Sequence, residues 1–203
     1  VIWAFPEAGE TPADFFERGF LPASPDLSRF YYCRNLRVAL ARFSLSSENR
    51  RVLRKGTGVD AELVPRHEFA FTATRRQAWK AYADQRFGAE VMGLDRLDRL
   101  MISPVVSHLL VYRETTTGRE LGAALLYLEP RRVAYYYYAF YDLAAFQRSL
   151  GMFMMTTAVQ HFARLGYAAL YLGSCYAERS LYKTQFHGLQ FCHGAGWSEN
   201  LAE

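Results

Sequence analysis

Residues 132–172 read RVAYYYYAFYDLAAFQRSLGMFMMTTAVQHFARLGYAALYL, and this stretch decides the fold. Its beginning, 132–140, is an aromatic run that is typical of a strand. Its middle carries an apolar residue at every fourth position, as Leu150, Met154, Ala158 and Phe162. That stripe predicts a helix, which Gly166 ends, and residues 167–172 read as a buried strand. A helix between two strands indicates a right-handed crossover and a parallel strand pair.

Further strands and one helix are expected on both sides of this unit. The strand-like runs are 106–114, 121–128 and 189–197, and the helical run is 177–188. Turns at 115–118 and 129–131 place the first two of these strands and 132–140 in an antiparallel meander. The expected fold class is therefore α/β (α+β), with a mixed, mostly antiparallel sheet flanked by helices. A cleft is expected where strands splay apart.

The first half of the chain adds elements with weaker patterns. Strands are expected over 35–43 and 66–74, and helices over 11–19, 46–56 and 75–88. Thr11, Ser47 and Thr74 are the expected N-caps of these helices, because a hydroxyl at that position accepts an orphan backbone N–H.

Composition narrows the class of protein. A chain of 203 residues, 51% hydrophobic and 22% charged, is expected to form one domain with a sizeable core, which excludes disorder. No run of 18 apolar residues occurs, so no membrane span is expected. Three cysteines without a CxxC pair favour a reducing, cytoplasmic setting. A net charge of +4 permits an RNA ligand without requiring one. The start at Val1, without Met, suggests trimming.

The order of these elements and one turn resemble the GNAT acyltransferase fold. In that family a Gln/Arg-x-x-Gly-x-Gly/Ala loop precedes the long helix, and its backbone N–H groups hold the pyrophosphate of acyl-CoA. Here the loop reads Gln147-Arg148-Ser149-Leu150-Gly151-Met152-Phe153, so Arg148 and Gly151 match. Phe153 stands where the second small residue belongs, and its bulk is expected to crowd a pyrophosphate.

A narrower resemblance is to the arginyl- and leucyl-tRNA–protein transferases, which carry a GNAT-like domain. Five motifs follow in that family's order: Phe140-Tyr141-Asp142, Ser149-Leu150-Gly151-Met152-Phe153, Leu170-Tyr171-Leu172-Gly173, Tyr182-Lys183-Thr184-Gln185-Phe186 and Trp197. Upstream, the family's spacing is matched by Arg37-Val38, Phe43, Ser46 and Arg50-Arg51. The family's N-terminal cysteine cluster is lacking, since only Cys33 stands there, so the chain resembles a divergent relative.

The resemblance implies a fold, a reaction and its partners. It implies a single GNAT-like domain over 1–203, with N-terminal helices and the first strand in 1–60 and an acyltransferase core in 105–197. The implied reaction moves an amino acid from charged tRNA, a co-substrate, onto the amine of a protein N-terminus, a peptide or a small molecule. No other cofactor and no membrane partner is expected. One alternative is an acyl-CoA-dependent N-acyltransferase, and another is a non-catalytic module that binds RNA or a partner.

Two residues are the catalytic candidates. By the resemblance, Tyr182 gives a proton to the leaving group, whereas the structural alternative is a core tyrosine. Asp142 follows a strand that leads to the cleft, where a carboxylate could hold the substrate amine. The alternative for Asp142 is an ordinary turn cap.

Binding candidates fall into three groups. The donor-binding set is Arg148, Ser149, Leu150, Gly151 and Lys183, in which Lys183 could pair with a phosphate or a substrate carboxylate. The RNA-binding set is Arg50, Arg51, Arg54 and Lys55, for which a solvated helix end is the alternative. The substrate-cleft set is Tyr137, Tyr141 and Tyr171.

Two further patterns give weaker expectations. Residues 135–138 are four tyrosines, and regular alternation predicts that two face each side of the sheet. The spacing of Cys175, His187, Cys192 and His193 matches no zinc pattern, so no metal site is expected. Cys175 has no identifiable base for a nucleophilic role.

Overall fold

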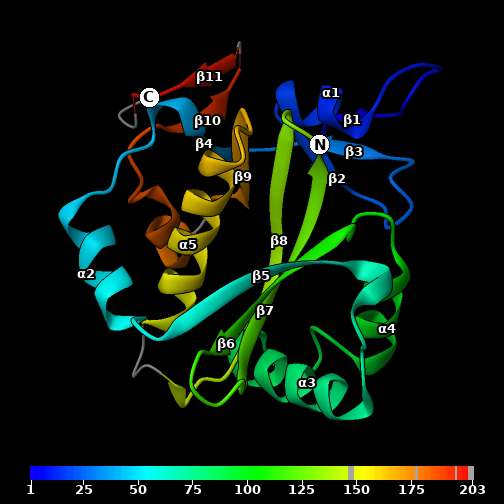
Figure 1. Ribbon diagram of the computed structural model, residues 1–203. Helices are drawn as coiled ribbons and strands as arrows, with labels where there is room; N and C mark the ends of the chain where they lie inside the picture. Colours follow the sequence, from blue (N-terminus) through cyan, green and yellow to red (C-terminus); the bar gives the residue numbers. More distant parts are fainter. Residues whose placement is uncertain (146–148, 177, 195, 201–203) are drawn as a thin grey trace.

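The computed structural model describes residues 1–145, 149–176, 178–194 and 196–200, apart from the side chain of Arg179 (Figure 1). Within these residues an eight-stranded sheet has the order β11-β10-β4-β9-β8-β7-β6-β5. Its strands are β4 (Asn35–Ala39), β5 (Val59–Pro65), β6 (His108–Glu114), β7 (Glu120–Glu129), β8 (Val133–Tyr141), β9 (Ala169–Ser174), β10 (Leu189–His193) and β11 (Gly196–Ser198). The predicted fold class, a mixed and mostly antiparallel sheet flanked by helices, is confirmed.

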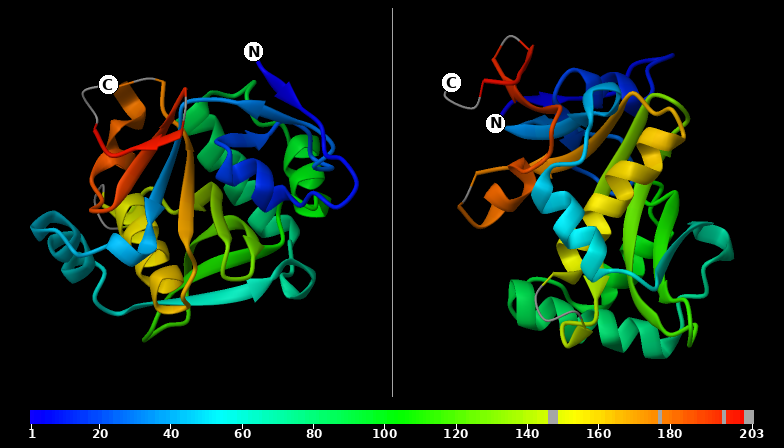
Figure 2. Two further views of the ribbon diagram at one scale, coloured as in Figure 1. Left: turned by 90° about the horizontal axis from the view of Figure 1, so that it is seen from above. Right: turned by 60° about the vertical axis from the view of Figure 1, so that its left-hand side comes forward.

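The predicted crossover is present. β5 to β8 form an antiparallel run, and helix α5 (Leu150–Arg164) carries the chain from β8 to β9, which pair in parallel. That parallel pairing joins Val133 to Ala169 and ends at Tyr135 and Tyr171. Strand β4, from the N-terminal part, lies between β9 and β10 (Figure 2).

Helices cover both faces of the sheet (Figures 1 and 2). One face carries α5 and α2 (Ser47–Lys55), and the main apolar core lies beneath them. The other face carries α3 (Ala73–Phe87) and α4 (Leu94–Ile102) over β6 to β8. Beside them, α1 (Pro12–Glu17) packs over β8 and β9 with a small sheet of β1 (Trp3–Ala4), β3 (Phe30–Tyr32) and β2 (Phe20–Pro22). No helix among the described residues is both long enough and apolar enough to cross a membrane.

A bulge in β8 changes the expected alternation of its tyrosines. Leu125 pairs with Tyr138 and Leu126 with Tyr136, so Tyr137 has no partner on β7. The extra residue lets neighbouring side chains share one face. Tyr135, Tyr137 and Tyr138 therefore face the α1, α3 and α4 side, whereas Tyr136 packs into the core beneath α5. The prediction of two tyrosines on each side is wrong.

The predicted strand over 66–74 is also wrong. Residues Arg66–Glu68 form a 3-10 turn, and Thr72 rather than Thr74 caps α3. The alternation that suggested a strand comes from Phe69 and Phe71, which both pack against Trp79 of α3.

Several boundaries differ from those expected. The strand expected over 35–43 ends at Ala39 and continues as a 3-10 turn, Leu40–Arg42, and Ser46 rather than Ser47 caps α2. The helix expected over 177–188 is the 3-10 helix η4 (Glu178–Thr184). The last strand is a hairpin of β10 and β11. Strand β5, helix α4 and the small N-terminal sheet were not predicted, because their apolar patterns are short.

Helix α2 rests on the first turns of α5 through one glycine. Gly56 caps α2 with φ −91° and ψ 12°, a backbone conformation that other residues adopt. A Cβ at Gly56 would overlap the ring of Phe153, which is itself 5% exposed. The contact between the helices therefore requires a residue without a side chain at position 56.

We expect Gly56→Ala to lower the free energy of unfolding by about 1–3 kcal/mol, because the new methyl group pushes α2 away from α5. Thermal or urea unfolding measures this change. Combining Gly56→Ala with Phe153→Leu removes the ring that is struck, so the two changes are expected to be non-additive by more than about 0.5 kcal/mol. Parent-like unfolding of Gly56→Ala would contradict this packing.

Candidate active site

Polar side chains gather where β8 and β9 separate. We call this region the splay: the part of β8 after Tyr135 and the part of β9 after Tyr171. Gly173 on β9 has a φ of +80°, a conformation that favours glycine. A Cβ at Gly173 would stand 3.8 Å from Lys183 Nζ and 3.9 Å from the Tyr135 hydroxyl oxygen. Gly173 therefore lies between an ammonium and a phenol.

Lys183 supplies the positive charge of the splay. Its half-buried side chain comes from η4, and Nζ donates a hydrogen bond to the carbonyl oxygen of Ser174 at 3.2 Å. Burial lowers the pKa of Lys183, and the nearby thiols of Cys175 and Cys33 act in the opposite direction. No carboxylate in the described part of the chain lies within 4.0 Å of Nζ. A partly buried ammonium without a counter-ion suits an anionic ligand.

Two neutral groups from the N-terminal part lie nearby: Tyr31 is close to Ser174, and Cys33 is close to Lys183. Burial raises the pKa of Tyr31 to about 12, although a hydrogen bond with Ser174 opposes the shift. Burial likewise raises the pKa of Cys33 to about 12. Both groups stay protonated at neutral pH, so Cys33 offers no thiolate nucleophile there.

Asn35 is a buried amide beside the same strand end. It pairs in register with Ser174 and has no exposed surface. Neither its Oδ1 nor its Nδ2 has a hydrogen-bond partner among the described residues. Buried polar atoms are usually paired, so this amide marks a place for a polar ligand atom or an ordered water molecule.

Phenol groups surround the α5 side of the splay. Tyr136 is 6% exposed, and its hydroxyl has no partner among the described residues. Tyr182 on η4 is 44% exposed, and burial of its phenol raises its pKa. Tyr141 and Arg86 lie close enough to Tyr182 to influence that pKa. At neutral pH Tyr182 is therefore a protonated donor at the mouth of the splay.

The predicted donor loop meets the predicted RNA-binding helix. Ser149 is the N-cap of α5, and Lys55 of α2 donates a hydrogen bond to Ser149 Oγ at 3.3 Å. A Cβ at Gly151 would stand 2.6 Å from the Tyr141 hydroxyl oxygen, so glycine allows the tyrosine to lie against the helix start. Leu150 is buried in the core. Arg148 lies outside the described residues.

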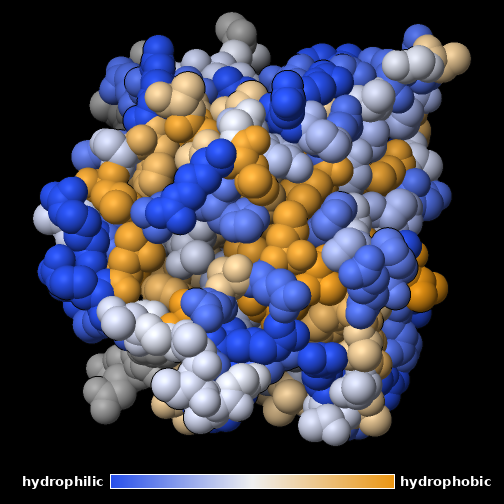
Figure 3. All heavy atoms as spheres, viewed as in Figure 1, coloured by the Kyte–Doolittle hydropathy of each residue, from blue (hydrophilic) through white to orange (hydrophobic). Residues whose placement is uncertain are grey.

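The four cations of α2 are all exposed, and Figure 3 shows a hydrophilic surface over this helix. Arg51 forms an ion pair with Glu48, and Arg50 donates to the carbonyl oxygen of Leu45. Arg54 forms no ion pair within the described residues. Together with Lys55, these side chains place a basic surface next to the start of α5.

Asp142 occupies the turn that follows β8. Its Oδ1 accepts the backbone N–H of Ala144 at 2.9 Å, and its Oδ2 accepts from Arg119 at 3.3 Å. These contacts are those of a turn cap. The catalytic role predicted for Asp142 stays a prediction.

The three tyrosines predicted for the substrate cleft are in different environments. Tyr137 and Tyr141 are half-buried at the splay. Tyr171 has no exposed surface; it packs against Phe16, and Arg37 donates to its hydroxyl at 3.3 Å. Tyr171 therefore anchors β9 instead of lining an open cleft.

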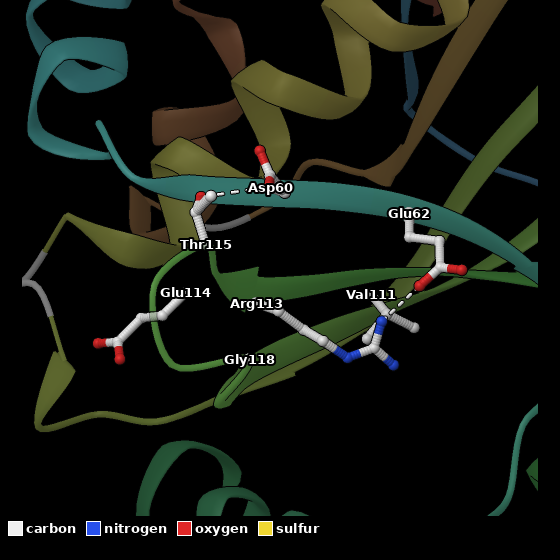
Figure 4. A pocket seen from close by; sticks show the side chains of 7 residues that line it. All are labelled: Asp60, Glu62, Val111, Arg113, Glu114, Thr115 and Gly118. Atoms are coloured by element: carbon white, nitrogen blue, oxygen red, sulfur yellow. Dashed lines mark hydrogen bonds and ion pairs between the residues drawn. The ribbon is translucent and has the colours of Figure 1, made fainter.

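A cavity of about 270 Å³ lies away from the splay, at the β5 edge of the sheet (Figure 4). Its charged side chains satisfy one another: Arg113 forms an ion pair with Glu62, and Thr115 donates to Asp60 at 3.1 Å. Among the described residues, no group of three or more His, Cys, Asp or Glu side chains could hold a metal ion. The splay is therefore the stronger candidate site.

Several groups of the splay were not found from the sequence. Tyr31 and Asn35 reach it only because they lie beside Ser174 at the end of β9, some 140 positions later in the chain. Gly173 stood in a motif but was not named as a site residue. Tyr136 was part of the four-tyrosine run, but the bulge that directs it toward α5 has no sequence signature.

Comparisons with known proteins show the family of the chain. A family model described as an acetyltransferase (GNAT) domain matches residues 41–184. The aspartate/glutamate leucyltransferase of Methylorubrum populi is 28% identical to the chain and aligns with 81% of it and 71% of its own length. The enzyme of the same name from Hyphomonas neptunium is 28% identical and aligns with 96% of this chain and 81% of its own length.

Solved structures share the fold. A C-terminal domain (DUF2156) from Agrobacterium fabrum superposes with a TM-score of 0.55 at 20% identity, over 74% of this chain and 49% of that one. The L-PGS structure from Bacillus licheniformis gives a TM-score of 0.52 at 15% identity, over 70% and 46%. The chain spans about half the length of these two structures.

The pH dependence of stability tests the environment of Lys183. Because burial lowers its pKa in the folded state, the unfolded chain binds more protons between that lowered pKa and the ordinary value of 10.5. The stability of the parent relative to Lys183→Met is therefore expected to rise with pH in this window. Melting curves between pH 7 and pH 10.5 measure it, with Lys80→Met as a control that leaves the trend unchanged. A constant difference would contradict the burial of this ammonium.

Proposed function

Because this chain belongs to the acetyltransferase (GNAT) domain family and is a transferase, we propose that it moves an aminoacyl group from charged tRNA onto an amine. The observation that carries the proposal is the contact between Lys55 of the basic helix and Ser149 of the donor loop. A phosphate backbone on α2 would lead the end of the nucleic acid to the start of α5, where the backbone N–H groups of the helix N-terminus would face the ligand.

The position of the Phe153 side chain gives no steric argument against acyl-CoA as the donor. Its ring is 5% exposed and packs edge-on against Tyr112 in the core. The expectation that this side chain crowds a pyrophosphate is therefore wrong; Phe153 supports α2 instead. What favours tRNA over acyl-CoA is the extent of the basic surface on α2, which exceeds what one pyrophosphate needs.

The reaction needs little covalent assistance from the protein. The neutral amine of the acceptor attacks the ester carbonyl carbon, a C–N bond forms, and an electron pair moves onto the carbonyl oxygen. When the pair returns, the C–O bond to the ribose breaks. The amine loses a proton to solvent, and Tyr182 gives its phenolic proton to the departing ribose oxygen. The enzyme mainly positions the partners and stabilises the oxyanion.

The charges near the splay favour a particular charge on the donor amino acid and on the acceptor. Lys183 is a cation without a carboxylate partner among the described residues, and the groups near it are Tyr135 and the thiols of Cys33 and Cys175. A cationic donor amino acid, such as arginine, would be repelled there, whereas an acceptor with an acidic side chain would be held. The proposal is therefore an uncharged donor amino acid and an acceptor that begins with aspartate or glutamate. Relatives named aspartate/glutamate leucyltransferase support it.

A transfer assay tests the two substrates. Radiolabelled leucyl-tRNA, arginyl-tRNA and acetyl-CoA are each offered with peptides that begin with Asp, Glu or Lys. Label is expected to pass from leucyl-tRNA to the acidic peptides. Lys183→Met is expected to raise KM for those peptides roughly tenfold to a hundredfold, because a charge-assisted hydrogen bond contributes about 1.5–3 kcal/mol. Lys80→Met is the control. Labelling from acetyl-CoA alone would replace this proposal with the acyl-CoA reaction.

Salt dependence tests the RNA surface. Each lost phosphate contact is expected to flatten the plot of log affinity against log salt by about 0.7–0.9. We expect this from Arg54→Gln and from Lys55→Gln, measured by filter binding of charged tRNA between 50 and 200 mM salt. Arg99→Gln, on the opposite face in α4, is the matched control. Parent-like affinity and slope for both α2 variants would exclude this helix from the tRNA site.

A further inference from the structure

Three tyrosines of β8 lie side by side on the face of the sheet that carries α1, α3 and α4. We call Tyr135, Tyr137 and Tyr138 the tyrosine row. The ring centroids of Tyr135 and Tyr137 lie 5.3 Å apart, and those of Tyr137 and Tyr138 lie 4.6 Å apart. Tyr137 and Tyr138 are half-buried, so part of each side chain meets solvent. Burial raises the pKa of Tyr137 to about 12, so its phenol carries no charge at neutral pH.

A cation lies at each end of the tyrosine row. At one end, a Cβ on Gly173 would stand 3.8 Å from Lys183 Nζ and 3.9 Å from the hydroxyl oxygen of Tyr135. At the other end, Nη2 of Arg96, on α4, donates a hydrogen bond to the hydroxyl oxygen of Tyr138 at 3.4 Å. The row therefore extends from the ammonium of the splay to the exposed guanidinium of Arg96.

The guanidinium of Arg96 has no acidic partner among the described residues. It donates to neutral oxygens, and no carboxylate oxygen of the described chain lies within 4.0 Å of its nitrogens. Both acids of the same helix face other arginines. Asp95 lies 4.0 Å from Arg99. Asp98 lies 2.7 Å from Arg76. An exposed guanidinium of this kind suits a carboxylate ligand, because its planar N–H groups match the two carboxylate oxygens.

Exposed apolar side chains border Arg96. The ring of Phe87 lies 6.3 Å from that of Tyr138 and is 39% exposed. Val91 is 48% exposed, and its carbonyl oxygen accepts a hydrogen bond from Arg96 at 3.1 Å. Aromatic surface beside an arginine is typical of a binding site for a polypeptide. A phosphate backbone is better matched by the closely spaced cations of α2, which lies on the other face of the sheet.

We propose that the acceptor is a polypeptide whose chain follows the tyrosine row, and that Arg96 binds an acidic side chain a few residues after its N-terminus. This proposal rests on the proposed function, in which Lys183 holds the first acidic residue. Tyr135 and Tyr138 are about 10 Å apart along an extended strand, in which each residue covers about 3.3 Å. The second acidic side chain is therefore expected at about positions 3 to 7 of the acceptor. Arg96 is then a specificity-determining residue for protein N-termini.

A transfer assay with paired peptides tests the role of Arg96. All peptides begin with Asp and are otherwise neutral, apart from one Glu or one Gln placed in turn at positions 3 to 7. With radiolabelled leucyl-tRNA, the parent is expected to favour Glu over Gln about two- to fivefold in kcat/KM at one or two adjacent positions. In Arg96→Gln this ratio is expected to fall to about one, and Arg96→Glu is expected to favour a Lys peptide instead. Each ratio is measured on one preparation, so a loss of folded enzyme cancels.

Arg99→Gln is the matched control, because it removes an exposed arginine from the same helix, and it is expected to keep the parent ratio. A parent without a preference at any position, or a preference that survives in Arg96→Gln, overturns this inference alone. A variant in which only the KM for charged tRNA rises also overturns it, since Arg96 would then contact RNA. A parent that labels no peptide from any aminoacyl-tRNA overturns the proposed function and this inference together.

Discussion

Three backbone pairs join β8 to β9, and the geometry of the site depends on where that parallel pairing stops. Tyr171, at the last pair, is held without exposed surface between Phe16, Trp197 and Arg37. Beyond it, the bulge at Tyr137 redirects one strand and the left-handed Gly173 redirects the other. The two strands are therefore paired at one end and unpaired at the other.

The charged side chains near this end of the strands differ between the two faces of the sheet. On one face the basic helix α2 is packed against the start of α5, so a polyanion bound there lies next to the donor loop. On the other face Lys183 lies near the thiol of Cys33 from the N-terminal part of the chain and near the phenol of Tyr135. Under the proposed function, donor and acceptor would approach from these two faces.

The sequence predicted the elements whose pattern is long and regular. The stripe of α5 and the meander of β6 to β8 were found because their apolar side chains meet one uniform surface. The strand expected at 66–74 was wrong, because Phe69 and Phe71 alternate in order to pack on Trp79. Lys183 and the α2 cations could be named from motifs. Their meeting with Asn35, Tyr31 and Ser149 could not, since it depends on contacts between distant segments.

The position of β4 in the sheet affects folding during synthesis. This strand comprises residues 35–39, yet its two neighbours are β9 at 169–174 and β10 at 189–193. When the ribosome has made the first half of the chain, β4 has been synthesised but its neighbours β9 and β10 have not. This part of the sheet therefore closes late in synthesis, and until then both edges of β4 are open to pairing with another chain.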